Sequence, residues 1–171
     1  LQPATAVWFN YFIDMNTQIK TIVGTGGIGT GVIYKLDGAH DLGRNESRRA
    51  ALSDQRDYCK LHIILHYISV LLKEMNFPAE VYPVGGTGED GAGAYLRKEM
   101  KNAGMNIRFV KKVPKSKTLS AVCFQYPDGS GGNITQKDSA LDRVAISTVW
   151  KSLADLKKRK KIHSGQWMSL A

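Results

Sequence analysis

The sequence predicts an α/β fold in which parallel strands are connected by helices. Apolar segments at residues 19–23 and 79–84 have the length and composition of short buried strands. Between them, residues 58–75 carry apolar side chains at helical spacing, and residues 92–103 show a second such pattern. The order strand, helix, strand, helix is typical of a sheet built from parallel crossovers.

Length and composition favour one globular domain. The chain has 171 residues, of which 43% are apolar and 23% are charged, as in ordinary folded domains. No apolar run reaches the roughly 20 residues of a membrane-spanning helix, so membrane insertion is not expected. Cys59 and Cys123 lack the spacing of a metal site, and we expect buried thiols and a cytoplasmic location.

The first strand leads into a glycine-rich segment at residues 24–31, which is expected to turn sharply. A second extended segment follows at residues 32–36. Residues 41–57 are polar and show neither helical nor strand periodicity, so they are predicted to form a loop.

The helix expected at residues 58–75 is the longest in the chain. The strand at 79–84 is followed by a glycine-rich turn at 85–91 and by the helix at 92–103, for which Gly104 is a C-cap candidate. The apolar positions of the long helix recur at three and four residues: Leu61, Ile64, Leu65, Ile68, Leu71, Leu72 and Met75.

The remaining segments predict a hairpin and a last helix. Residues 107–113 and 119–126 are strand-like, and the turn at 127–132 indicates a hairpin inserted in the α/β unit. Residues 144–156 are expected to be helical, and residues 161–170 to begin another strand.

One glycine motif is typical of dinucleotide-binding proteins. The spacing of Gly24, Gly26 and Gly29 after a strand matches the fingerprint of nicotinamide-dinucleotide-binding domains, in which a helix N-terminus binds the pyrophosphate. That fold requires a helix directly after the glycines, whereas Gly31 lies where the helix would grow. The glycine spacing thus supports dinucleotide binding while the missing helix opposes it, and dinucleotide binding is an alternative function for this chain.

The charge distribution provides a second alternative. The formal net charge is +9, and part of it lies in the basic run at residues 157–161, which would attract phosphates. This run would suit a non-catalytic basic binding module. No aromatic residues alternate with it, so a solvated helix end is favoured and nucleic-acid binding is not expected.

A strand, a glycine-and-acid motif and a helix follow one another in residues 81–104. The motif is Gly85-x-x-Gly88-x-Asp90-x-x-Gly93. An acidic residue at this point suits the N-terminus of the helix behind it, and we expect Asp90 to cap that helix. The pattern continues with a threonine before an apolar segment and a glycine-rich hairpin, which are Thr118 and residues 128–133.

Residues 21–144 thereby resemble a divergent subgroup of the ribokinase-like (PfkB-type) carbohydrate kinases. The resemblance implies an α/β fold, a partial ribokinase-like three-layer α/β/α sandwich with a small β lid. Residues 1–171 would form a single partial domain, the substrate-side half, with lid strands within residues 32–45 and 107–135. The implied function is that of a fragment of an ATP-dependent kinase that phosphorylates a hydroxyl of a sugar or nucleoside-like small molecule.

In this family the catalytic Asp belongs to a Gly-Ala-Gly-Asp loop in the second half of a longer chain. The similar run that begins at Asp90 has Ala94 in the last position and so lacks the carboxylate. No catalytic residue is therefore expected in this chain. ATP and Mg²⁺ are expected to bind the intact enzyme and neither to bind this chain tightly, so that the chain alone is inactive.

Five residues are candidates for substrate binding: Gly26, Gly27, Lys60, His62 and Asn133. The glycines would let the backbone approach a ligand, the next two begin the long helix, and Asn133 would reach the ligand from the hairpin. No metal site is expected. Lids of this family often pair between subunits, which implies a homodimer. The family's substrate-binding Asp after the first strand is missing here, since residues 26–29 contain no carboxylate.

Overall fold

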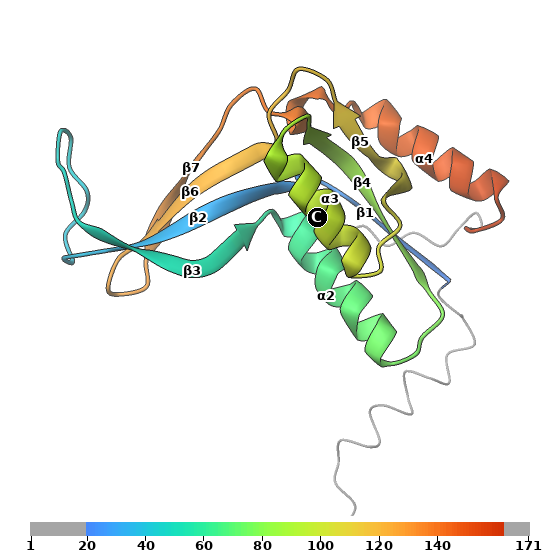
Figure 1. Ribbon diagram of the computed structural model, residues 1–171, viewed down its shortest axis with the longest axis horizontal. Helices are drawn as coiled ribbons and strands as arrows, with labels where there is room; N and C mark the ends of the chain where they lie inside the picture. The colour runs from blue at the N-terminus through green and yellow to red at the C-terminus, as the bar shows by residue number, and fades with distance from the viewer. Residues whose placement is uncertain (1–19, 163–171) are drawn as a thin grey trace, which may run out of the picture.

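The computed structural model describes residues 20–162, apart from the side chains of residues 54–58. Its strands form a three-stranded core sheet and a four-stranded sheet that projects from one side of the core (Figure 1). We name the four-stranded sheet the lid sheet after the expectation from the sequence. In chain order the elements are β1 (Thr21–Thr25), β2 (Gly29–Leu36), β3 (Ala50–Tyr58), α2 (Lys60–Glu74), β4 (Glu80–Gly88), α3 (Gly91–Asn102), η1 (Ile107–Phe109), β5 (Val110–Val113), β6 (Leu119–Gln125), β7 (Gly131–Thr135), η2 (Ala140–Arg143) and α4 (Ile146–Lys158).

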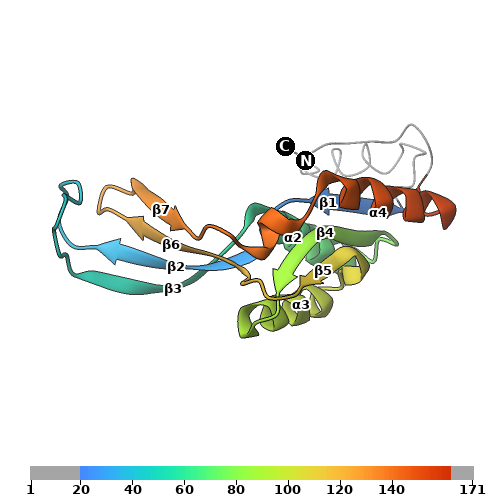
Figure 2. The same ribbon diagram turned by 90° about the horizontal axis from the view of Figure 1, so that it is seen from above.

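The core sheet has the order β1-β4-β5, and both strand pairs are parallel. Helices α2 and α3 lie on one face of this sheet and α4 lies on the other, which gives three layers (Figure 2). Parallel sheets bury both faces in this way because the helices of the crossovers cover them. The predicted α/β fold with parallel crossovers is confirmed.

Close contact between helices and sheet explains the apolar pattern of the sequence. Leu61 and Leu65 of α2 are buried against β1, where a Cβ on Gly24 would lie 2.7 Å from Leu61 Cδ1. In α3, Leu96 and Met100 are fully buried. The two helices correspond to the predicted segments because their apolar residues recur at the helical period.

The predicted helix end at Gly104 is also confirmed. Gly104 follows α3 with a φ of +89°, a left-handed conformation that favours glycine. Next to it, the Ser69 hydroxyl of α2 donates a hydrogen bond of 2.7 Å to the Ala103 carbonyl. The end of α3 is thereby fixed to α2.

The lid sheet has the order β3-β2-β6-β7. Strands β2 and β6 are parallel, and each carries an antiparallel neighbour, β3 and β7. The predicted hairpin is β6–β7. The expectation of a loop over residues 41–57 is wrong from Ala50 onward, because β3 is a sheet edge with a register shift opposite Val32 and Ile33 and therefore shows no regular alternation.

Two expected turns are partly strand. Gly85 to Gly88 pair with Val110 to Val113 as the last four residues of β4, so the turn comes only after them. Likewise Gly29 to Gly31 belong to β2. Most of the strand expected at residues 161–170 lies outside the described residues.

The same strand β2 bears on the dinucleotide-binding alternative. After β1 the chain passes through Gly26 and Gly27 and enters β2, not a helix. The backbone N–H groups of a helix N-terminus, which bind the pyrophosphate in that fold, are therefore missing after this motif. The structure does not favour this alternative.

Candidate functional site

The junction between the two sheets is the candidate functional site. Here the chain leaves β1 through Gly26 and Gly27, and it returns from β3 to α2 through Cys59. A Cβ on Gly27 would lie 3.5 Å from Cys59 Cβ, and one on Gly29 would lie 2.8 Å from Cys59 Sγ. A side chain at Gly29 would force these segments apart, because its Cβ would also lie 2.6 Å from the Leu119 carbonyl oxygen, whereas the contact at Gly27 is an ordinary van der Waals distance.

Asp90 fixes the segment through which the chain passes from the core sheet into β6 of the lid sheet. As N-cap of α3 it accepts a hydrogen bond of 2.8 Å from the Gly93 N–H. The same carboxylate accepts bonds from the N–H and the hydroxyl of Thr118, the residue before β6. Thr118 Oγ1 in turn accepts a bond of 2.9 Å from the Gly88 N–H. The expected capping role is confirmed, and the carboxylate also holds the base of the lid.

These bonds determine the ionisation of Asp90. Partial burial alone would raise its pKa, but the donors from Thr118 and Gly93 outweigh this and hold the pKa below its usual value of 3.8. The group is therefore ionised at neutral pH. With its lone pairs engaged by three donors, it is not available as a general base.

The glycines of the glycine-and-acid motif pack against protein. A Cβ on Gly93 would lie 2.6 Å from the Gly88 carbonyl oxygen and 2.7 Å from Thr118 Oγ1, and one on Gly88 would overlap the Ser116 carbonyl. Their side-chain positions are thus occupied by the segment that leads into β6. In this chain the motif anchors the lid sheet to the core.

The lid sheet has two faces of different character. Successive side chains along a strand point to opposite faces of the sheet, and residues paired across neighbouring strands point to the same face. The apolar lid face includes Val32, Tyr34, Leu52, Val122, Phe124 and Ile134. The small-residue lid face includes Gly31, Ile33, Ser53, Ala121, Cys123, Asn133 and Thr135, and it continues to Lys35 and Gln125 at the far end of the sheet.

The small-residue lid face is directed toward the N-terminus of α2. Gly29 has the same alternation as Gly31 and Ile33, and its Cβ position contacts Cys59, the N-cap of α2. The apolar lid face is directed the other way, where Leu52 is 61% exposed and Ile134 is 69% exposed.

The structure brings four of the five predicted site residues to one side of the molecule. Gly26, Gly27 and Lys60 meet at the junction, and Lys60 is exposed at the first position of α2. Asn133 is exposed on the small-residue lid face opposite Cys123. Because Cys123 is four residues along β6 from Leu119, Asn133 lies about 13 Å from the base of the lid.

His62 lies apart from the other four. It is fully buried inside α2, 5.7 Å from the ring of His66. Burial, with a smaller contribution from the charge of His66, lowers the pKa of His62 to about 4. The imidazole is therefore neutral at physiological pH and belongs to the core of the helix layer.

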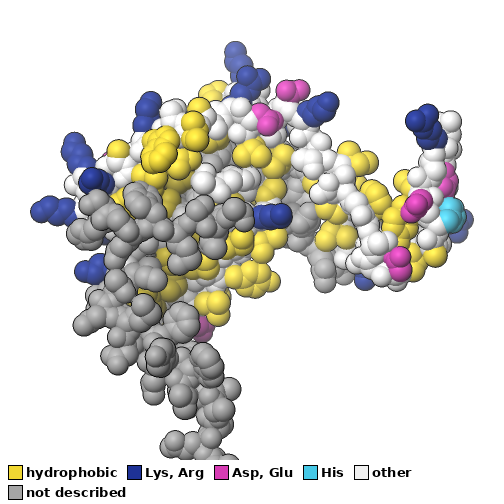
Figure 3. Space-filling model, turned by 180° about the vertical axis from the view of Figure 1, so that it is seen from behind, with side chains coloured by type: hydrophobic (Ala, Val, Ile, Leu, Met, Phe, Trp, Pro, Cys, Tyr) yellow, Lys and Arg dark blue, Asp and Glu magenta, His cyan; other side chains and the backbone are white. Residues whose placement is uncertain are grey.

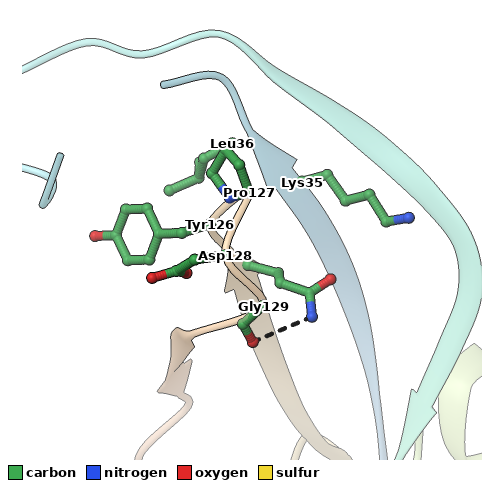
Figure 4. A pocket seen from close by; sticks show the side chains of 7 residues that line it. Lys35, Leu36, Tyr126, Pro127, Asp128 and Gly129 are labelled. Atoms are coloured by element: carbon green, nitrogen blue, oxygen red, sulfur yellow. Dashed lines mark hydrogen bonds between the residues drawn. The ribbon is translucent and has the colours of Figure 1, made fainter. Parts of the chain in front are cut away.

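Two hollows lie outside the junction. One, of about 380 Å³, is at the far end of the lid between β2 and β6, where Gln125 Nε2 donates to the Gly129 carbonyl (Figure 4). The other, of about 190 Å³, lies between α4 and the edge of the core sheet. Sequence reasoning did not find either, because their residues come from separate segments.

Within residues 20–162, no group of three or more His, Cys, Asp or Glu side chains is placed to hold a metal ion. The described residues therefore offer no cluster of carboxylates that would suit Mg²⁺. Within the same range, no helix has the length and hydropathy needed to cross a bilayer.

Comparison with protein-family models and with curated protein sequences gives no match. Solved structures do give matches. The ribokinase from Giardia lamblia aligns with 83% of this chain and 40% of its own, with a TM-score of 0.65 and 16% identity. The ribokinase from Cryptococcus neoformans var. grubii serotype A, in complex with ADP, aligns with 69% and 34%, with a TM-score of 0.55 and 18% identity.

A nucleoside kinase from Burkholderia thailandensis, in complex with inosine, is also similar, with a TM-score of 0.51 and 19% identity over 68% of this chain. This chain spans between 34% and 40% of the length of the three kinases. At such identities the likeness concerns the fold. The described residues therefore have a partial ribokinase-like α/β fold.

Proposed function

We propose that this chain is the substrate-side part of an ATP-dependent kinase that phosphorylates a hydroxyl of a sugar or nucleoside-like small molecule. The observation that carries the proposal is the arrangement at the junction: the small-residue lid face rises from the same place as the Gly26–Gly27 backbone and the N-terminus of α2. A lid beside such a junction encloses a small ligand and keeps water from the reacting phosphate.

The residues at the junction suit a hydroxylated ligand. Lys60 offers three N–H donors, the Asn133 amide both donates and accepts, and the backbone at Gly26 and Gly27 approaches without a side chain in between. Small side chains on the lid face leave room above them. ATP and Mg²⁺ are assigned to residues outside this chain, and the cytoplasmic location predicted from the cysteines belongs to the same proposal.

Titration calorimetry on the full 171-residue chain tests the proposal, with D-ribose, D-fructose and inosine as ligands and NADH as the comparison. One of the first three should bind saturably, and NADH should not. Asn133→Ala should weaken that binding several-fold, since a lost hydrogen bond contributes about 1 kcal/mol. Ile134→Ala changes the neighbouring residue on the opposite face and should leave it unchanged. Equal effects of both variants, or tight binding of NADH, would contradict the proposal.

We also propose that the apolar lid face pairs with that of a second copy. Its exposed members form one patch on a projecting sheet, which consists of Val32, Leu52, Val122 and Ile134. Apolar patches of this kind mark association surfaces. A two-fold axis through the patch would bring the same residues of both subunits together and close the assembly as a homodimer.

A further inference from the structure

The hollow beside α4 has an unusual concentration of positive charge. It is lined by Arg108 and Phe109 of η1, Lys111 of β5, and Thr148, Lys151 and Ser152 of α4. Helix α4, which lines it, lies on the face of the core sheet opposite α2 and α3 (Figure 2). Figure 3 shows Lys and Arg side chains around the part of the molecule remote from the lid, where Asp and Glu are fewer.

Among the residues that the structure describes, Asp155 is the carboxylate paired with these cations, and it does not neutralise them. Asp155 binds Arg108 at 3.2 Å and Arg159 at 2.8 Å. Although desolvation opposes it, the combined contacts with both guanidinium groups keep the pKa of Asp155 below 3.8, so Asp155 is ionised. Within residues 20–162, neither Lys111 nor Lys151 forms an ion pair. The five charged groups together carry a formal charge of +3.

The floor of the hollow fixes one of the ammonium groups. Lys111 Nζ donates a hydrogen bond of 3.1 Å to Thr148 Oγ1, and Thr148 is only 6% exposed. The Thr148 hydroxyl accepts this bond and retains its own proton as a donor. Ser152, also buried, donates to the Thr148 carbonyl at 2.8 Å and holds that turn of α4 in place. The cations thus surround a structured polar floor.

We propose that this hollow binds a phosphate-type anion, that is, a small phosphorylated molecule. Arginine and lysine pair strongly with phosphate oxygens, and a concave cluster of one sign concentrates the opposite charge. The volume of about 190 Å³ suits a phosphoryl group with a small attached part. The proposal does not depend on the kinase assignment, because none of the junction residues takes part.

Inorganic pyrophosphate is the probe for the test, titrated into the full 171-residue chain by calorimetry at low salt. We expect one saturable site. Lys111→Met and Lys151→Met should each weaken binding by about tenfold, the effect of losing one charge-assisted hydrogen bond. Circular dichroism melting should show unchanged folding, above all for Lys151, which is exposed.

Lys112→Met is the matched control. Lys112 is the next residue of β5, points to the other side of the strand and pairs with Glu89 at 3.3 Å, so its replacement makes the same change in net charge. The affinity of the Lys112→Met variant for pyrophosphate should stay within about twofold of the affinity of the parent chain. If all three variants weaken binding equally, the attraction is diffuse and the site is disproved.

A single-stranded RNA distinguishes a small phosphorylated ligand from a nucleic-acid surface. Pyrophosphate should compete with any RNA bound at this hollow. RNA binding that is tight, steeply salt-dependent and insensitive to pyrophosphate would overturn the proposal in favour of a nucleic-acid surface. Failure to reach saturation below about 10 mM pyrophosphate would also overturn it.

Discussion

The core sheet and the lid sheet differ in how far their faces are buried. The core sheet is covered on both faces, and residues such as Val84 and Leu96 are fully buried. In the lid sheet every residue of β7 is exposed, and large apolar side chains such as Ile134 face outward. The core therefore supplies most of the stability of the chain, whereas the lid sheet leaves much of its surface exposed.

The largest expected effect separates these two regions by stability. Leu96→Ala removes a fully buried side chain and should lower the free energy of unfolding by about 3 kcal/mol. Ile134→Ala, at a residue that is 69% exposed, should change it by less than about 0.5 kcal/mol. Urea denaturation monitored by circular dichroism measures both. Similar losses would show that the lid sheet contributes to the core.

A second effect, of similar size, depends on pH and arises in the core. The pKa of His62 is about 4 in the folded chain and about 6.5 when unfolded. The unfolded chain therefore binds more protons between these values, and stability falls as the pH is lowered from about 6.5 to about 4. The total loss from this group is about 3 kcal/mol.

Denaturant titrations at a series of pH values measure this loss. His62→Leu should flatten the profile in that window because the titrating group is gone. His40→Gln is the control, since the side chain of His40 is 73% exposed in the lid. A profile that is unchanged by His62→Leu would contradict the buried, neutral state of His62.

A smaller effect concerns the attachment of the lid to the core. Asp90→Ala removes the N-cap of α3 and both bonds to Thr118, and should cost about 2 kcal/mol. Asp90→Asn can still cap α3 but presents an amide to one of the Thr118 donors, so its loss should be smaller. Because the folded pKa of Asp90 is lowered, the stabilisation is present above pH 3.8 and is lost as the pH falls through that folded pKa.

Hydrogen exchange shows where Asp90 acts. In Asp90→Ala, the amides of Thr118 and β6 should exchange faster than those of β4, because the carboxylate holds the start of β6. Uniform acceleration throughout the core would instead mean that Asp90 only caps α3.

The same contrast explains what the sequence could reveal. Helices α2 and α3 were predictable, because burying one face against a sheet imposes the helical period on their apolar residues. Strand β3 was not, since it lies at the edge of the lid sheet, has an irregular register and begins with exposed residues at Ala50 to Leu52. Gly85 to Gly88 predicted a turn because glycine is frequent in turns. In the structure these glycines are part of β4, where the missing side chains let neighbouring segments pack closely against the strand.

The positions of the candidate site were predictable from local patterns for the four residues that lie on one side of the molecule, Asn133 of the hairpin among them, and their role in binding stays a prediction. Gly26 and Gly27 could be found from one glycine run, and Lys60 from the start of one helix. His62 lies two residues after Lys60, yet the helix turns it into the core. Lys111 and Lys151 are forty positions apart and meet only because α4 packs against the edge of the core sheet, which no local pattern encodes.

The smallest expected effect on stability carries the sharpest test of the lid. Ile134→Lys adds a charge to the apolar lid face but should change the free energy of unfolding of a monomer by less than about 0.5 kcal/mol, since Ile134 is already exposed. If two copies pair through this face, the same change should abolish the dimer, because a buried unpaired ammonium is costly in an interface.

Sedimentation velocity over a range of concentrations measures the dimer fraction. Asn133→Lys adds the same charge on the opposite face and should leave the dimer intact. Dissociation by both variants, or by neither, would mean that the apolar lid face does not hold a second copy.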